Sequence, residues 1–275
     1  MGKISDALEK IDYLEERSII DHRGGKEQIE ESILPEAPSV IAIEEDANPV
    51  KVNGEWDERL SIALNNNSKL PKVFETLRST IINPIDGTKV PQTIMVASSI
   101  AQEGKSFIAA NLGVSFARGS EQHCLLVDIN LLKPTLAQAF GINQKYGLAD
   151  YLRDQADIAE VVIKTSLPKL SILPGGIAPD DSADLLSSPR MHALVEDLSN
   201  RYEDSTIIID SPAMLTATES VVLSGQVDAI LMIVRQGMTK KKEAQRFIDV
   251  VDETNILGIV INDILLEKSA QNQIM

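Results

Sequence analysis

The sequence predicts an α/β fold, with a doubly wound, mostly parallel sheet that carries helices on both faces. From about residue 70 onward, short apolar runs alternate with segments of helical periodicity. These runs are apolar on both faces, which is typical of parallel strands covered by helices on each side. A strand-like run, a loop with Gly104 and a helix-like run also follow one another, as in phosphate-binding folds.

The same pattern places the individual elements along the chain. Strands are expected at residues 93–97, 123–128, 169–173, 206–210, 228–234 and 256–262. Helices are expected at residues 105–118, 134–140, 147–153, 157–164, 189–201, 217–225 and 240–254. Ser188 before Pro189 predicts an N-cap followed by proline at the first position of a helix.

Composition limits the function classes. The net charge of −15 argues against general binding to DNA or RNA. Cys124 is the only cysteine, so the chain has no disulfide framework and no cysteine-rich zinc site, and we expect a buried, reduced thiol. No run of about 18 apolar residues is present and the start lacks the apolar region of a signal peptide, so we expect a cytoplasmic location.

The N-terminal quarter differs in character from the rest. Residues 1–17 predict an amphipathic helix, which either binds a protein partner or packs on its own domain. Residues 18–68 are polar and acidic and predict a flexible acidic linker, in which Trp56 is either a docking anchor or incidental. We then expect residues 69–267 to form the α/β domain and residues 268–275 to form a short tail.

The loop "SSIAQEGKSF", residues 98–107, predicts a phosphate-binding site. Such a loop needs inward-pointing backbone N–H groups, a lysine for the phosphates and a hydroxyl for Mg²⁺, and the next helix offers its N-terminus to the anion. The alternative is a coincidental Gly-Lys-Ser turn. The candidate nucleotide-binding residues are Ser99, Gln102, Glu103, Gly104, Lys105, Ser106 and Phe107.

Two carboxylates sharpen this prediction. Asp128 ends one predicted strand and Asp210 ends another. Ligands of doubly wound sheets lie beyond the carboxyl ends of the strands, so both residues should face the same crevice as Lys105 and Ser106. An acid in this place can hold Mg²⁺ or orient a nucleophile, although a single Asp at a strand end is often only a turn former.

Together these motifs resemble the cytoplasmic domain of bacterial tyrosine kinases (BY-kinases), the autokinases of capsule and exopolysaccharide systems. That family lies in the deviant P-loop ATPase group, with the Min-type and Par-type ATPases. The resemblance covers about residues 70–263. It rests on the ordered stretches "FETLRSTI", "VASSIAQEGKSFIAANL", "LLVDINLLKPTLAQAFG", "GLADYL", "LPGGIAPDDSADLLSSPRMHALVEDL", "IIIDSPAML", "VDAILMIVRQGMTKKK" and "LGIVIND".

The resemblance implies roles and partners. ATP or ADP with Mg²⁺ would be the cofactor, and the catalytic residues would be Lys105, Asp128 and Asp210. Ser106, Asp128, Asn130 and Asp210 would hold the metal. The family transfers phosphate from ATP to tyrosine within a ring of subunits. Its partner is a membrane polysaccharide co-polymerase of the chain-length-determinant type, so we expect a peripheral location at the inner membrane through that partner.

The sequence departs from the family at the site. In the pattern D-x-D-x-R, Asn130 replaces the second Asp and Leu132 replaces the Arg. An amide oxygen carries no charge, so metal affinity should fall. Gln102 stands where the family usually has glycine, and Ala213 replaces a proline.

It also departs at the expected subunit contact and at the C-terminus. The family's E-x-x-R-x-x-R motif reads Lys72, Glu75 and Arg78, with two of the three charges reversed, so a homo-oligomer would have an altered interface. No tyrosine follows Tyr202, so the usual C-terminal tyrosine cluster is absent. Tyr13 could replace it as phosphate acceptor or be an ordinary helix residue.

Three functions therefore compete. The chain is an ATP-binding tyrosine kinase of exopolysaccharide or capsule assembly, a degenerate kinase that works as a nucleotide-dependent switch, or a Min/Par-like positioning ATPase. Asn130, Leu132 and the missing tyrosines favour the second function over the first. The third is disfavoured because Ser99 and Ile100 stand where those ATPases place an extra lysine.

Overall fold

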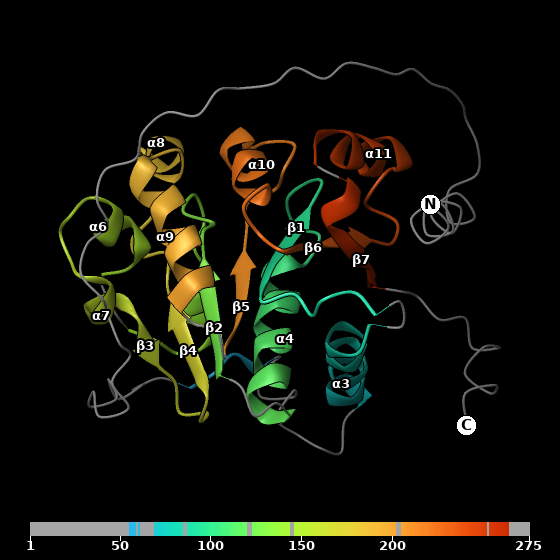
Figure 1. Ribbon diagram of the computed structural model, residues 1–275, viewed down its shortest axis with the longest axis horizontal. Coiled ribbons are helices and arrows are strands. Elements are labelled where there is room, and N and C mark those ends of the chain that lie inside the picture. Colours follow the sequence, from blue (N-terminus) through green and yellow to red (C-terminus); the bar gives the residue numbers. More distant parts are fainter. Residues whose placement is uncertain are drawn as a thin grey trace.

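The computed structural model describes residues 55–58, 60, 69–84, 87–119, 123–143, 146–201, 205–251 and 253–263. The expected N-terminal helix 1–17 and the tail 268–275 lie outside these residues, and so does most of the expected linker. The described part contains a seven-stranded sheet with helices on both faces (Figure 1). The predicted doubly wound, mostly parallel α/β fold is confirmed.

The order of the strands places the three predicted site strands at the centre. The sheet runs β3-β4-β2-β5-β1-β6-β7, and among the described strands only β3 pairs antiparallel, with β4. Because β2, β5 and β1 are parallel neighbours, their carboxyl ends meet at one edge. The strands are β1 Thr93–Ser98, β2 His123–Asp128, β3 Ile163–Lys164, β4 Leu170–Leu173, β5 Ser205–Asp210, β6 Ala229–Arg235 and β7 Ile256–Asn262.

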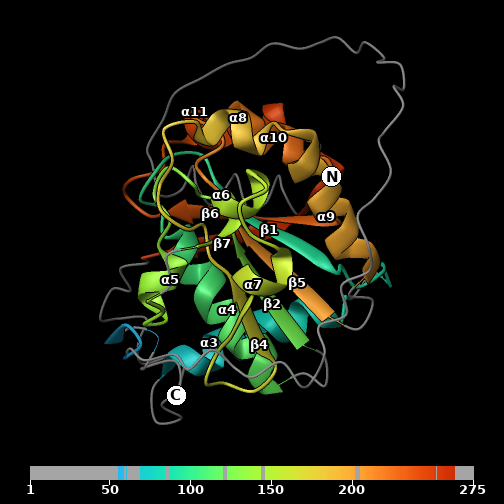
Figure 2. The same cartoon turned by 90° about the vertical axis from the view of Figure 1, so that its left-hand side faces the viewer.

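The helices divide between the two faces of the sheet. Those on one face are α3 Lys69–Ile82, α4 Lys105–Gly119 and α5 Leu136–Ala139. Those on the other are α6 Leu148–Leu152, α7 Ile158–Val161, α8 Ser182–Leu186, α9 Pro189–Arg201, α10 Thr218–Ser224 and α11 Lys241–Val250. Figure 2 shows α8, α10 and α11 gathered at one end of the molecule, away from α3, α4 and α5.

Successive side chains of the central strands point to opposite faces of the sheet, so each strand contributes to two hydrophobic cores. In β1, Ile94 and Val96 join the core under α3 and α4, whereas Met95 and Ala97 join the core under the other helices. All six residues of β1 are buried, as expected for a strand covered on both sides. Cys124 of β2 is also buried, which confirms the predicted thiol environment, and burial raises its thiol pKa.

Two predicted helices are wrong in extent. The expected helix 157–164 ends at Val161, and Ile163–Lys164 instead form β3. Val162 and Ile163 are β-branched and favour extended backbone over a longer helix, and Ile163 pairs with Ile172 at the edge of β4. The expected helix 240–254 ends at Val250, and a 3₁₀ turn covers Glu253–Asn255.

The start of α9 follows the predicted capping chemistry. The helix begins at Pro189, and the Met191 N–H donates to the Ser188 hydroxyl at 3.2 Å. The side chain thereby satisfies one of the N–H groups that a helix start leaves without a partner. None of the helices in the described part of the chain is long and apolar enough to cross a membrane.

Candidate functional site

A cavity of about 570 Å³ lies at the carboxyl edge of the sheet, where the predicted phosphate loop runs from β1 to α4. Its lining comes from the loop, from the segment after β2, from the segment after β5 and from residues before α3. The lining residues are Asp57, Leu60, Ala101, Gln102, Gly104, Lys105, Ser106, Phe107, Ala110, Asn130, Leu132, Lys133, Thr135, Leu136, Gln138, Ala139, Pro212, Ala213 and Thr216.

Two positions of the loop adopt left-handed backbone conformations. Gly104 has φ +95°, and a Cβ there would lie 2.2 Å from Nδ2 of Asn262, so only glycine fits. Gln102 has φ +68°, although it carries a side chain. This conformation favours glycine, so a residue with a side chain here costs the chain about 1 kcal/mol.

The side chain of Glu103 holds the loop together from inside. It is fully buried, and its carboxylate accepts the Ile100 N–H at 2.8 Å and the Thr239 hydroxyl. The Thr239 hydroxyl in turn accepts the Arg235 N–H at 2.8 Å. Because both carboxylate oxygens of Glu103 are used in this way, the side chain braces the loop rather than facing the cavity.

The carboxyl ends of β6 and β7 clamp the loop from outside. Arg235 donates through Nη1 to the Gln102 carbonyl at 3.1 Å and pairs with Asp263 at 3.0 Å. Asn262 donates through Nδ2 to the Glu103 carbonyl at 3.0 Å. These two bonds occupy the carbonyls of Gln102 and Glu103 and hold the backbone of the loop in place beside the cavity.

Lys105 and Ser106 open α4 and line the cavity. Lys105 is only 6% exposed. Burial lowers the pKa of its ammonium, while the charges of Asp210 and Glu103 oppose that shift. A buried cation at a helix N-terminus that follows a glycine loop is chemically suited to a phosphate chain.

Asp210 ends β5 without hydrogen-bond partners. It is fully buried, and neither carboxylate oxygen is hydrogen-bonded within the described part of the structure. Burial, and then the charge of Asp128, raise its pKa to about 8, while the Ser106 hydroxyl, whose contact with the carboxylate falls short of a standard hydrogen bond, and the charge of Lys105 lower it in part. A buried carboxyl group with both oxygens unused suits a divalent cation, which would supply the missing partner.

Asp128 ends β2 in the same register, directly opposite Asp210. Its carboxylate accepts three backbone N–H groups, from Asn130 at 3.1 Å, Thr135 at 2.9 Å and Leu136 at 3.0 Å. Burial raises the pKa of Asp128 to about 6 against the effect of these bonds. Asp128 therefore fixes the segment from Asn130 to Leu136, which forms one wall of the cavity.

These residues fit a magnesium nucleotide better than an isolated metal ion. The described residues hold no group of three or more His, Cys, Asp or Glu arranged around one point. Asp210, the Ser106 hydroxyl and the Asn130 amide supply protein oxygens near the loop, and phosphate oxygens would supply others, as is usual for Mg²⁺.

The structure brings most of the predicted site residues together. Gln102, Gly104, Lys105, Ser106, Phe107 and Asn130 line the cavity, while Ser99, Glu103, Asp128 and Asp210 are buried and are not among its lining residues. Sequence reasoning missed the clamp formed by Arg235, Thr239 and Asn262, and it also missed Asp57 and Leu60. Arg235 and Asn262 are the last residues of their strands, so the strand-end rule used for Asp128 would have found them.

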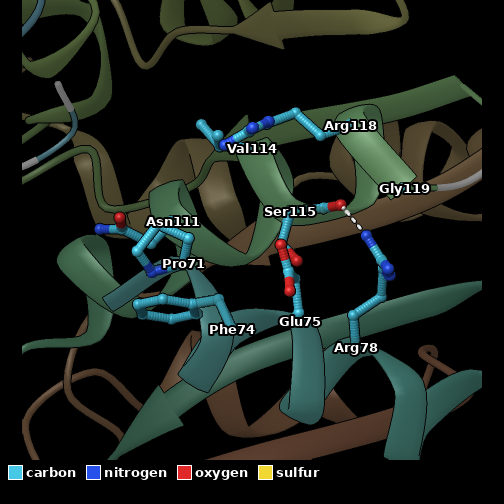
Figure 3. A pocket seen from close by; sticks show the side chains of 9 residues that line it. All are labelled: Pro71, Phe74, Glu75, Arg78, Asn111, Val114, Ser115, Arg118 and Gly119. Carbon is cyan, nitrogen blue, oxygen red and sulfur yellow. Dashed lines mark hydrogen bonds between the residues drawn. The ribbon is translucent and has the colours of Figure 1, made fainter. Parts of the chain in front are cut away.

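A second, smaller hollow of about 120 Å³ lies between α3 and α4, away from the strand ends (Figure 3). Arg78 crosses it and donates to the Ser115 carbonyl. A Cβ on Gly119 would collide with the same guanidinium, so α4 ends close against this side chain. Arg78, one of the expected subunit-contact residues, is thus engaged within its own chain.

Comparison with curated proteins shows similarity to bacterial tyrosine kinases. The chain is 29% identical over 182 residues to tyrosine-protein kinase YwqD of Bacillus subtilis, covering 66% of this chain and 76% of that protein. It is 32% identical over 161 residues to putative tyrosine-protein kinase EpsB of Ralstonia nicotianae, covering 58% of this chain. The chain spans 21% of EpsB and 26% of tyrosine-protein kinase ptk of Acinetobacter johnsonii, so it matches only part of these relatives. No protein-family model matches the chain.

Solved structures show the same relationship. The chimerical protein CapA2B2 superposes with a TM-score of 0.69 at 26% identity, over 77% of this chain and 92% of that one. The BceF tyrosine kinase domain gives 0.62 at 25% identity, over 73% and 81%. The septum site-determining protein MinD of Pyrococcus horikoshii, solved with Mg-ADP, shares the fold with a TM-score of 0.52 at 19% identity, over 67% and 77%.

Proposed function

Because this chain is similar in sequence and in fold to the kinase domains of bacterial tyrosine kinases, we propose that it binds ATP and Mg²⁺ in the cavity at the carboxyl edge of the sheet. We propose further that it serves exopolysaccharide or capsule assembly, where it controls polymerisation or chain length with a membrane co-polymerase. It would reach the membrane through that partner. YwqD and ptk are named as tyrosine kinases and EpsB as a putative one, which supports phosphoryl transfer from ATP as the chemistry of the site.

One observation carries the proposal: Lys105 and Ser106 open a helix beside a buried Asp210 whose oxygens have no partner in the described structure. The lysine would neutralise the β- and γ-phosphates, and the loop N–H groups would cradle them. Ser106 and Asp210 would hold Mg²⁺, which stabilises the charge that develops during transfer. The cavity is large enough for a nucleotide, at about 570 Å³.

A second function, a degenerate kinase that works as a nucleotide switch, is favoured by the segment after β2. The Asp128 carboxylate is occupied by three backbone N–H groups, so it is poorly placed to take a proton from a tyrosine hydroxyl. Asn130 brings no charge and Leu132 is 59% exposed where the family has arginine. Such a site would retain nucleotide binding and lose most of the phosphoryl transfer.

Phosphate acceptors within the chain are few. Tyr151 is buried and its ring lies under the guanidinium of Arg190, at 4.4 Å. Tyr146 is 48% exposed, and Tyr13 and Tyr202 lie outside the described residues. A Min/Par-like positioning ATPase stays the third candidate, and the absence of a lysine at Ser99 and Ile100 argues against it.

Calorimetry with ATP and ADP, with and without Mg²⁺, tests nucleotide binding. Lys105→Ala should weaken binding about 10- to 100-fold because it removes a buried charge-assisted contact to phosphate. Lys133→Ala is the matched control, since Lys133 lines the same cavity outside the loop, and it should change the affinity only a few-fold. Absence of heat from the unmodified protein would refute all three functions.

Incubation with γ-labelled ATP and Mg²⁺ separates the three candidates. Label on tyrosine, mapped by mass spectrometry, identifies an active kinase. Tight binding with negligible transfer or hydrolysis identifies a switch. Steady release of labelled phosphate without labelled protein identifies a positioning ATPase.

A further inference from the structure

Three exposed apolar side chains lie on loops at the carboxyl ends of β2 and β4. Leu132 is 59% exposed, Ile177 is 64% exposed and Tyr146 is 48% exposed. Leu132 follows β2, Ile177 lies between β4 and α8, and Tyr146 lies between α5 and α6. We call these three residues the apolar patch.

Close contacts hold the three loops of the apolar patch together. A Cβ on Gly175 would lie 2.8 Å from Cβ of Pro134, so these two loops touch. The Leu148 N–H donates to the Pro174 carbonyl at 2.7 Å, which joins the third loop to them. Each member of the apolar patch is two residues along the chain from one of these contacts, so the three residues share one region of the surface.

The apolar patch is continuous with the lining of the candidate nucleotide cavity, because Leu132 belongs to both. Apolar residues that stand singly on a surface are normal and need no partner. A group of large apolar side chains on adjoining loops is instead typical of an interaction surface. The apolar patch is therefore a candidate docking surface.

The chain enters the described part of the structure in this region. Residue 55 is the first that the structure describes. The Asp57 N–H donates to the Ala139 carbonyl at 2.8 Å, and Trp56 packs edge-on against Phe140, with ring centroids 4.9 Å apart. Both contacts are with the end of α5, a helix that begins four residues after Leu132. The preceding part of the chain is thereby tethered near the apolar patch.

Residues 2–17 fit this surface by their sequence pattern and by their reach. Ile4, Leu8, Ile11 and Leu14 recur at helical spacing, so a helix here would have one apolar face. A flexible chain as long as residues 18–54 has a root-mean-square end-to-end distance of about 30–35 Å, which is enough to reach loops beside its own tether. Attachment within one chain gives an effective concentration on the order of a millimolar, so a small apolar contact is sufficient.

We infer that residues 2–17 dock as a helix on the apolar patch of their own chain, with the apolar face of the helix against Leu132 and Ile177. Docking removes apolar surface of both partners from water, which is its driving force. The docked helix lies beside the candidate nucleotide cavity. This inference does not depend on the proposed function, since it holds whether or not the cavity binds a nucleotide.

Hydrogen exchange of the full chain without nucleotide, followed by mass spectrometry, tests the docking. An isolated helix of this length is marginal in water, so its amides exchange nearly as fast as those of an unstructured chain. A docked helix is protected. We expect the amides of residues 5–17 to exchange at least about tenfold more slowly than unstructured amides. The protection should be the same at low and high protein concentration, because both partners belong to one chain.

Ile177→Ser tests the surface, with Val73→Ser as its matched control. The two side chains are similarly exposed, at 64% and 61%, but Val73 lies on α3, outside the three loops. Ile177→Ser should lower the protection of residues 5–17 at least about threefold, because it removes an apolar contact. Val73→Ser should leave the protection within about twofold of the unmodified chain.

Four outcomes would overturn the inference. Exchange of residues 5–17 at the unstructured rate in the full chain would mean that the segment does not dock. Protection that survives Ile177→Ser would place the segment on another surface, and equal losses in Ile177→Ser and Val73→Ser would show that the apolar patch has no special role. Protection that grows with protein concentration would place the segment on a second copy of the chain.

Discussion

The ends of β2 and β5 carry the same residue in the same register and use it in different ways. Asp128 and Asp210 are paired across the sheet, and both are fully buried. Three backbone N–H groups bind the carboxylate of Asp128, whereas the carboxylate of Asp210 accepts no hydrogen bond from the described residues. One carboxylate organises the protein, and the other is the one that we propose as a ligand for Mg²⁺.

The segment that follows each strand causes this difference. After Asp128 the chain turns back, and α5 directs its first N–H groups at the carboxylate. After Asp210, the Ser211 N–H donates to the Val96 carbonyl at 3.3 Å, and Pro212 has no N–H to offer. An acid at a strand end is therefore a candidate metal ligand only when the backbone N–H groups of the following residues do not bind its carboxylate.

Asp128→Ala should produce the largest change in stability. The substitution leaves three backbone N–H groups without an acceptor, and each such buried group lowers the free energy of unfolding by about 1–3 kcal/mol. The substitution also removes the repulsion between Asp128 and Asp210, which offsets part of this loss. We expect a net loss of about 2–3 kcal/mol in the free energy of unfolding, measured by urea denaturation. Asp228→Ala is the control, because Asp228 also accepts three bonds but is exposed. Equal losses in the two variants would contradict the assigned role of Asp128.

Asp210→Asn should have a smaller effect and the opposite sign. Burial and Asp128 raise the pKa of Asp210 in the folded state, so folding is penalised once the group ionises. The stability of the metal-free protein should be complete below about pH 4 and fall as the pH rises toward about 8. Asn removes the part of this dependence that comes from Asp210, while Asp128 keeps its own, and it should stabilise the metal-free protein at pH 8 by at least about 1 kcal/mol, the equivalent of a single pKa unit.

The same variant should lose the gain in ATP affinity that Mg²⁺ gives, which calorimetry measures. This exchange of stability for function is expected of a residue kept for a ligand. A Mg²⁺ effect that survives Asp210→Asn would place the metal elsewhere, and a flat pH profile of the unmodified protein would show that the buried carboxyl group carries no penalty.

Local sequence pattern was sufficient to predict the residues at the strand ends. It did not predict the contacts between segments that are distant in the sequence. Apolar runs located β1, β2 and β5, and these strands placed Lys105, Asp128 and Asp210 at one edge. The clamp on the loop depends on Arg235 and Asn262, more than 100 residues away, and pairing across the sheet decides that contact. The occupancy of Asp128 depends on the path of the next eight residues, which strand and helix periodicity does not specify.

Asn130→Asp gives the smallest effect and the finest comparison of the two strand ends. Asn130 lines the cavity beside the occupied Asp128, so a carboxylate there would add the free anionic oxygen that the β2 side lacks. Mg·ATP binding should tighten about 3- to 10-fold, while ATP binding without Mg²⁺ should weaken, because the new charge repels the phosphates.

Gln138→Glu is the control, because it adds a charge to the same cavity away from the strand ends. It should weaken the binding of ATP with and without Mg²⁺ alike. The ratio of the two affinities, from calorimetry, is the measure, and a ratio unchanged by Asn130→Asp would mean that the metal is held from the β5 side alone.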